Sequence, residues 1–502
     1  MIHLRLVARC FFVSFFFFPA TAQEPEEITV RFDENKTYQT IQNFAASDAW
    51  SCQFVGNWPS KKKNAIADLL FSLDTFPNGN PKGIGLSMWR YNLGAGSSEQ
   101  GAGSGIRDEW RRAPSIQGNS KRVAAQNWFL RAAKKRGVEQ FLGFFNSPPV
   151  QLTKNGRAYA DSGNCNIDSL NYGRFADYTV SAIRQIKDVT AILLDYISPV
   201  NEPQWDWSDG GQEGCPYNNR EISGLVKVLN KAFQREGLTT KLLITESGQL
   251  NYLLTATDKH EKDNQVDDFF NIASPLYVGD LPFVSRTIAA HSYFTTSPIS
   301  SAIAIRTKIN DSISQIKDLG FWQSEYCILG DNAGEINGKK KDLGIGAALY
   351  VAKVIYEDLS AANAAAWQWW TAISAYDYKD GLIYVEKKEN DGGFSDSKML
   401  WALGNYSRFV RPGMQRIALK MPTVRDLYLS AYMDTRIKQL VCVLVNESAH
   451  KKTVRFEKTK NAGGFNNITF YVTDAFTNLA KNEVRGGKIM VPAKSIVTAI
   501  LK

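Results

Sequence analysis

The chain has 502 residues, of which 44% are hydrophobic and 22% charged; this is typical of a globular protein with one large and one smaller domain. The formal net charge of +9 is spread along the chain, and the lysine runs at residues 61–63 and 339–341 are not interleaved with aromatic residues. This pattern indicates solvated surface charge, and we expect no nucleic-acid partner.

The first 22 residues have the organisation of a secretory signal peptide. Arg5 and Arg9 form a basic start, residues 11–18 are an apolar run too short to span a bilayer, and small residues lead up to a cleavage site after Ala22. We expect a secreted or periplasmic protein whose mature chain begins near Gln23. No later segment is long and apolar enough to be a transmembrane helix.

Short apolar strands alternate with amphipathic helices between residues 40 and 410. The strands are expected at residues 44–50, 84–91, 141–145, 191–200, 242–245, 288–293, 321–325 and 364–370. The helices between them are expected at residues 61–73, 124–136, 175–186, 225–233, 301–319 and 343–359. Eight alternations predict an α/β fold, a (β/α)8 TIM barrel. A doubly wound open sheet is the main competitor, but the glycine-rich stretch at 94–105 lacks the spacing of a phosphate loop.

The pattern changes after residue 410. Residues 427–432, 439–445, 453–456, 468–472 and 495–501 are strand candidates, and helical periodicity disappears. Residues 411–502 are therefore predicted to form a β-sandwich side domain. The strand-like stretch at 28–32, within the segment 23–39, lies outside the eightfold alternation and is a candidate to join that sandwich.

Cysteine and histidine are sparse. The mature chain keeps Cys52, Cys165, Cys215, Cys327 and Cys442, with no C-x-x-C pair, and the sequence has four histidines with no H-x-x-x-H spacing. We therefore expect no metal and no other cofactor. Cys165 and Cys215 lie in loop-like sequence and are a possible disulfide pair. We expect a monomer.

Three glutamates lie at the ends of strand-like runs. Glu202 follows the fourth expected strand in Asn201-Glu202-Pro203, and Glu325 ends the seventh in Ser324-Glu325-Tyr326. Glu246 ends the fifth. Catalytic residues of a TIM barrel lie at the carboxyl ends of its strands, and glycoside hydrolysis needs two carboxyl groups beside the scissile bond. The pair Glu202 and Glu325 therefore predicts a glycosidase, whereas a single strand-end acid is more often an ion pair or a loop cap.

These motifs resemble the retaining barrel hydrolases of clan A, and more narrowly glycoside hydrolase family 30. The supporting stretches are Phe44-Ala45-Ala46-Ser47-Asp48-Ala49-Trp50, Arg90-Tyr91-Asn92, Asn146-Ser147-Pro148-Pro149 and Trp367-Gln368-Trp369-Trp370. Within the family, the first of these stretches and Ser324-Glu325-Tyr326-Cys327 are most similar to the endo-β-1,6-galactanase branch. One departure is Val150-Gln151-Leu152, where many members have an aromatic residue and methionine.

The resemblance implies a double displacement with Glu202 as general acid/base and Glu325 as nucleophile, acting on β-1,6-galactan side chains of arabinogalactan. The partner is thus a polysaccharide or oligosaccharide. Eight further residues at strand ends are candidates for the substrate site: Asn201, Arg90, Tyr293, His291, Trp369, Asp48, Trp50 and Asn146. Among them, Arg90 and Tyr293 are expected to donate to Glu325. Adjacent strand residues face opposite ways, so only one of Trp369 and Trp370 is expected to stack on the sugar, and Trp369 is the favoured candidate.

Two alternatives remain open. The same chemistry could act on β-1,6-glucan or a substituted xylan. A protein of another class, a carbohydrate-binding protein without catalysis, would bind the polysaccharide and release no reducing ends.

Overall fold

The computed structural model of the protein describes residues 27–118, 120–255, 258–458 and 465–501. The predicted signal peptide lies outside these ranges. None of the helices formed by the described residues is long and apolar enough to cross a membrane.

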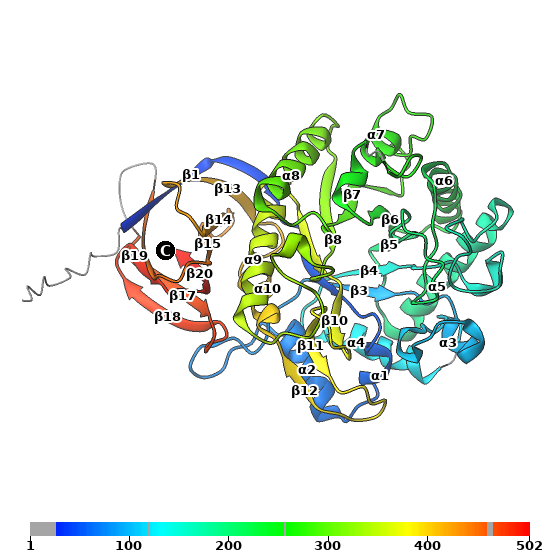
Figure 1. The fold of residues 1–502 in the computed structure, drawn as a ribbon, viewed down its shortest axis with the longest axis horizontal. Coiled ribbons are helices and arrows are strands. Elements are labelled where there is room, and N and C mark those ends of the chain that lie inside the picture. The colour runs from blue at the N-terminus through cyan, green and yellow to red at the C-terminus, as the bar shows by residue number, and fades with distance from the viewer. Residues whose placement is uncertain (1–26, 119, 256–257, 459–464, 502) are drawn as a thin grey trace, which may run out of the picture.

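Eight parallel strands close into a barrel, as the sequence predicts (Figure 1). In chain order they are β2(Asn43–Ser47), β3(Met88–Asn92), β4(Gln140–Phe144), β5(Tyr196–Ser198), β6(Lys241–Ser247), β7(Val284–His291), β8(Gly320–Glu325) and β9(Ala366–Trp369). The first and last strands pair in parallel, from Asn43 opposite Ala366 to Ala46 opposite Trp369, and this pairing closes the ring. The carboxyl ends of all eight strands therefore meet at one rim.

Helices surround the barrel. They are α1(Cys52–Val55), α2(Ser60–Phe71), α3(Ser97–Gln100), α4(Lys121–Lys135), α5(Tyr172–Thr190), α6(Asn219–Arg235), α7(Gln265–Phe270), α8(Ile299–Ser314), α9(Ile345–Ser360) and α10(Lys398–Ser407). The helix α6 begins with a capping box between Asn218 and Glu221, which satisfies two of its free N–H groups. The α5 helix runs up to Thr190 and Ala191 takes a left-handed conformation (φ 60°), so β5 is only three residues long where the sequence suggested ten.

A small sheet follows the eighth barrel strand. It consists of β10(Thr371–Ser374), β11(Gly381–Val385) and β12(Phe394–Asp396). The β10 and β11 strands pair in parallel, so residues 375–380 form a loop that crosses from the end of one strand to the start of the other.

The side domain is one nine-stranded sheet of mixed direction. Its strands are β1(Glu27–Thr40), β13(Gln415–Lys420), β14(Leu427–Asp434), β15(Gln439–Asn446), β16(Lys452–Lys458), β17(Asn467–Thr473), β18(Ala480–Arg485), β19(Lys488–Val491) and β20(Ser495–Leu501). The N-terminal strand joins this sheet as expected, antiparallel to β13 and parallel to β16. Figure 1 shows this blue strand among the orange and red ones, with α9 and α10 between the sheet and the barrel.

Candidate active site

A cavity of about 690 Å³ opens at the carboxyl-end rim of the barrel. Glu202 and Glu325 both line it. Eight aromatic side chains also face it: Trp50, Trp205, Trp207, Tyr293, Phe294, Trp370, Tyr376 and Tyr378. Aromatic walls with a few polar groups are typical of a site that binds an organic ligand with apolar faces.

The two glutamates approach each other closely. A carboxylate oxygen of Glu202, one of Glu325 and a ring nitrogen of His291 all lie within 4.8 Å of one another. Glu202 follows the short strand β5 and has a left-handed backbone (φ 46°), and its N–H donates to the Glu246 carbonyl at 2.8 Å. The barrel therefore brings together two carboxylates that are 123 residues apart in sequence.

Glu325 is held by two donors. Arg90 Nη1 donates to Oε2 at 3.0 Å, and the Tyr293 hydroxyl donates to Oε1 at 3.1 Å. Burial raises the pKa of Glu325, opposed by the positive charges of His291 and Arg90 and reinforced by the negative charges of Glu202 and Glu246. The Arg90 and Tyr293 contacts were both predicted from the sequence, and they orient Glu325 while stabilising its ionised form.

His291 connects Glu202 to a third carboxylate. Its Nδ1 lies 2.9 Å from Glu202 Oε1, and its Nε2 lies 3.1 Å from Glu246 Oε2. Burial alone would lower the pKa of His291, but the negative charges of Glu325, Glu202 and Glu246 raise it to about 10. The ring therefore carries a proton on both nitrogens at neutral pH. Glu202, His291 and Glu325 are ligand types for a metal, and a metal bound here would have to displace the proton on Nδ1 of His291.

Glu246 is the third carboxylate of this network and is fully buried. It accepts from the hydroxyls of Ser198 (2.6 Å) and Ser324, and Arg90 Nη2 lies 3.6 Å from its Oε1. Burial would raise the pKa of Glu246, but Arg90 and His291 together lower it to about 2. The sequence marked Glu246 as a strand-end acid, and the structure places it behind His291, outside the cavity lining.

The lowered pKa of Glu246 predicts how its replacement affects stability. A carboxyl group whose pKa is about 2 when folded and 4.5 when unfolded stabilises the protein above pH 4.5, and this contribution is lost as the pH falls towards 2. Glu246→Gln should lower the free energy of unfolding by roughly 3 kcal/mol at pH 6 and by less than half of that at pH 3.

Urea unfolding of both proteins at the two pH values measures this difference. The exposed Glu386, which pairs with Lys388, offers a matched control, and Glu386→Gln should change the unfolding midpoint little at either pH. A deficit for Glu246→Gln that is equal at both pH values would show that its charge is not involved.

Three of the predicted site residues do not line the cavity. Trp369 is buried outside the cavity, and Trp370 lines it instead, with its ring 5.2 Å from that of Trp50. Asp48 does not line the cavity: its carboxylate accepts from the Asn92 N–H at 2.7 Å and from Gln126 at 3.3 Å, and burial raises its pKa to about 7. Asn146 is likewise buried behind the site.

The other predicted residues have distinct places. Trp50, Asn201 and Tyr293 line the cavity. Arg90 and His291 do not line it, but they contact Glu325 and Glu202, which do. Asn146 Oδ1 accepts from Asn201 Nδ2 at 3.0 Å, so Asn146 orients Asn201.

Several cavity residues were not predicted. They come from loops that follow the strands: Arg111, Trp205, Trp207, Gln212, Phe294, Leu329, Trp370, Tyr376, Tyr378 and Asp380. Aromatic residues directly after Asn201-Glu202-Pro203 and after the eighth strand were the available signal.

Cys165 and Cys215, the possible disulfide pair, are both buried free thiols.

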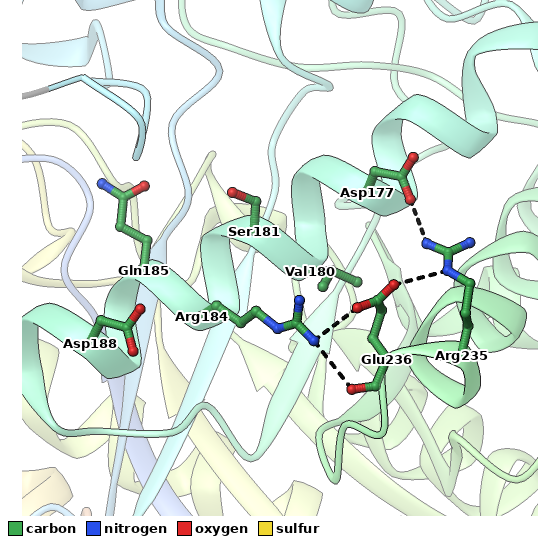
Figure 2. A pocket seen from close by; sticks show the side chains of 8 residues that line it. All are labelled: Asp177, Val180, Ser181, Arg184, Gln185, Asp188, Arg235 and Glu236. Atoms are coloured by element: carbon green, nitrogen blue, oxygen red, sulfur yellow. Dashed lines mark hydrogen bonds and ion pairs between the residues drawn. The ribbon is translucent and has the colours of Figure 1, made fainter.

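A second hollow of about 480 Å³ lies on the outside of the barrel, between α5 and the end of α6 (Figure 2). Figure 2 shows its ion pairs, with Arg235 between Asp177 and Glu236, and Arg184 on the other side of Glu236. These side chains satisfy one another, and the Asp177–Arg235 pair is more than half exposed. The hollow is therefore a solvated charge network on the outer helices, and none of its lining residues lines the cavity of the paired glutamates.

Known proteins share the sequence and the fold. A curated endo-β-1,6-galactanase of Hypocrea rufa is 23% identical over 467 residues, which cover 88% of this chain and 86% of that protein. A crystal structure of a conserved exported protein from Bacteroides fragilis is 33% identical, with a TM-score of 0.85 over 94% of this chain and 100% of that one. The catalytic domain of the family 30 xylanase C from Talaromyces cellulolyticus shares the fold at 19% identity, with a TM-score of 0.68 over 95% of this chain and 100% of that one.

The family model described as O-glycosyl hydrolase family 30 matches residues 27–384. This region contains the barrel, both paired glutamates and every residue named above that lines the cavity. The chain therefore belongs to O-glycosyl hydrolase family 30.

Proposed function

We propose that the protein is a secreted, retaining endo-β-1,6-galactanase that cleaves the β-1,6-galactan side chains of arabinogalactan. The observation that carries the proposal is the approach of the Glu202 and Glu325 carboxylates to within 4.8 Å on one cavity. Retaining glycosidases need their two carboxyl groups about 5–5.5 Å apart, because one attacks the sugar directly and no water fits between.

In the first step, Glu325 attacks the anomeric carbon and forms a glycosyl ester. The donors Arg90 and Tyr293 hold both of its oxygens, so the carboxylate is oriented before substrate binds. Glu202 gives its proton to the leaving glycosidic oxygen. Since His291 Nδ1 occupies Oε1 of Glu202, the other oxygen, Oε2, is left to carry that proton.

In the second step, Glu202 removes a proton from water, which attacks the anomeric carbon and releases Glu325. Glu202 can exchange roles because it gave its proton to the leaving oxygen in the first step and is then a carboxylate beside the glycosyl ester. Two displacements at one carbon retain the anomeric configuration.

The substrate is proposed from the galactanase relative and from the sequence motifs of that branch. The test is product analysis on three polysaccharides: de-arabinosylated arabinogalactan, the β-1,6-glucan pustulan, and glucuronoxylan. We expect β-1,6-galactooligosaccharides from the first and at least 10-fold slower release of reducing ends from the other two. Faster release from pustulan or glucuronoxylan would assign the enzyme to that substrate.

The non-catalytic alternative makes a different prediction in the same experiment. A carbohydrate-binding protein would retain the polysaccharide in affinity electrophoresis and release no reducing ends from any of the three. The presence of Arg90 and Tyr293 on Glu325 favours catalysis, because binding alone does not require a carboxylate held in place by two donors.

A further inference from the structure

The loop between β10 and β11 forms one wall of the cavity, through Tyr376, Tyr378 and Asp380. Two side chains outside the loop's cavity face hold its backbone by hydrogen bonds to carbonyl groups. The Trp369 indole Nε1–H donates to the Asp380 carbonyl at 2.6 Å, and the Tyr384 hydroxyl donates to the Tyr378 carbonyl at 2.7 Å. The wall is therefore fixed before a ligand binds, and Trp369 contributes to the site through this loop.

Asp380 is a buried acid that lacks a full set of partners. Its side chain belongs to a residue only 7% exposed, and its Oδ1 has no hydrogen-bond partner among the described residues. Burial raises the pKa of Asp380 to about 6, opposed by a hydrogen bond from Ser374 and by the positive charge of Arg111. A buried carboxylate oxygen without a donor is costly, so a donor from the ligand would be favourable here.

Arg111 faces the same part of the cavity. Its guanidinium carbon lies 5.2 Å from the centre of the Trp50 ring and 4.9 Å from that of Tyr376, so two aromatic rings hold the cation. Its Nε is buried without a hydrogen-bond partner in the part of the chain that the structure describes. None of the described carboxylates, including Asp380, forms an ion pair with Arg111 within 4.0 Å.

The position of this pair relative to the glutamates identifies which part of the substrate it meets. Glu202 protonates the leaving oxygen, and the loop that carries Glu202 also carries Trp205 and Trp207, so the leaving portion of the chain lies there. Asp380 follows the eighth strand, which lies opposite the fourth in the ring of eight, and Arg111, which follows the second strand, contacts Tyr376 on the same loop as Asp380. They therefore face the sugars that stay attached to Glu325 during the reaction.

We propose that Asp380 and Arg111 jointly bind one hydroxyl group of a neutral sugar on this side of the scissile bond, and so act as a specificity-determining pair. The hydroxyl donates to the Asp380 carboxylate and accepts from the Arg111 guanidinium. A hydroxyl can do both at once, and Asp380 senses the charge of Arg111 without an ion pair between the two. The inference rests on the proposed function and adds the recognition of its substrate.

The test uses aryl β-1,6-galactobiosides in which single hydroxyls of the two galactose residues are replaced by hydrogen. For wild-type protein, removal of one particular hydroxyl should lower kcat/KM roughly 10- to 100-fold, as expected for a hydrogen bond to a charged group. In Asp380→Ala the same removal should cost less than about 3-fold, because the partner is already gone. In Arg111→Gln, removal of the same hydroxyl should likewise lower kcat/KM less than it does in wild type. In the double variant the loss of kcat/KM should be no smaller than in the single variants.

Two controls keep the outcomes distinct. Asp380→Asn keeps an acceptor in place and should restore part of the discrimination, whereas Asp391→Asn, at the exposed Lys62 ion pair, should leave the pattern of wild type. A wild-type protein that cleaves no β-1,6-galactan would overturn the proposed function itself. An active protein in which Asp380→Ala and Asp380→Asn both respond to every deoxy substrate as wild type does would overturn the pair. A wild-type preference for uronic-acid substrates that Arg111→Gln abolishes would also overturn it, since it would assign Arg111 to a carboxylate.

Discussion

Glu325→Ala should lower kcat on β-1,6-galactan roughly 10⁴- to 10⁶-fold, a loss of the size seen when the nucleophile of another covalent enzyme is removed. The variant lacks the carboxylate that Arg90 and Tyr293 hold and that is proposed to form the glycosyl ester. Initial rates of reducing-end release, with far-ultraviolet circular dichroism to confirm folding, measure the effect.

Sodium azide provides the positive control for that variant. Azide is small enough to enter the space that the carboxylate leaves and attacks an activated aryl β-galactobioside from the face opposite the leaving group. The product should be an α-glycosyl azide, of inverted configuration, identified by proton NMR. A variant that keeps more than about a tenth of wild-type activity would remove Glu325 from the nucleophile role.

Glu202→Ala should have an effect that depends on the leaving group. On the polysaccharide, whose leaving oxygen needs a proton, kcat/KM should fall about 10²- to 10⁴-fold. On an aryl glycoside with an acidic phenol as leaving group, the first step needs no proton and kcat/KM should change little. The second step still lacks its base, so the ester accumulates and both kcat and KM should fall.

Azide distinguishes the two glutamates. In Glu202→Ala it attacks the glycosyl ester on Glu325, and the product should be a β-glycosyl azide of retained configuration. Equal losses of kcat/KM on the polysaccharide and on the activated aryl glycoside would contradict the assignment of Glu202 as acid. Glu389→Ala, an exposed acid on the β11–β12 connection, serves as the matched control and should keep wild-type rates on both substrates.

The barrel and its paired glutamates could be predicted because both are encoded locally. Eightfold alternation of buried strands and amphipathic helices is visible in sequence, and a parallel barrel brings every strand's carboxyl end to one rim. Glu325 ends such a strand, and Glu202 lies four residues after the end of another. Their proximity needed only the strand order, which the alternation supplies.

The orientation of individual side chains could not be predicted in the same way. In β9, Gln368 reaches Asn43 on the neighbouring strand, while the Trp367 indole donates to Asp358 on α9 outside the barrel. Trp369 shares the outward face with Trp367, and the alternation sends Trp370 towards the cavity. Alternation predicts that one of the two tryptophans faces the cavity, but only the structure shows which one it is.

Contacts between distant segments account for the remaining differences. The pairing of β7 with β8 shifts register between Ala290 and His291, and such an irregularity changes where a side chain points. His291 therefore reaches Glu202 and Glu246 rather than the cavity. Asp48 is withdrawn from the site by the Asn92 N–H, a partner on the next strand that strand-end position alone does not reveal.

Covalent trapping addresses the proposed mechanism without any substitution. A 2-deoxy-2-fluoro β-1,6-galactobiosyl fluoride should inactivate the enzyme, because fluorine slows both steps while the good leaving group still allows the first. Peptide mass spectrometry should then find the sugar on the peptide that contains Glu325. Attachment to Glu202 or to a residue elsewhere, or unhindered turnover to a product of inverted configuration, would contradict the double displacement.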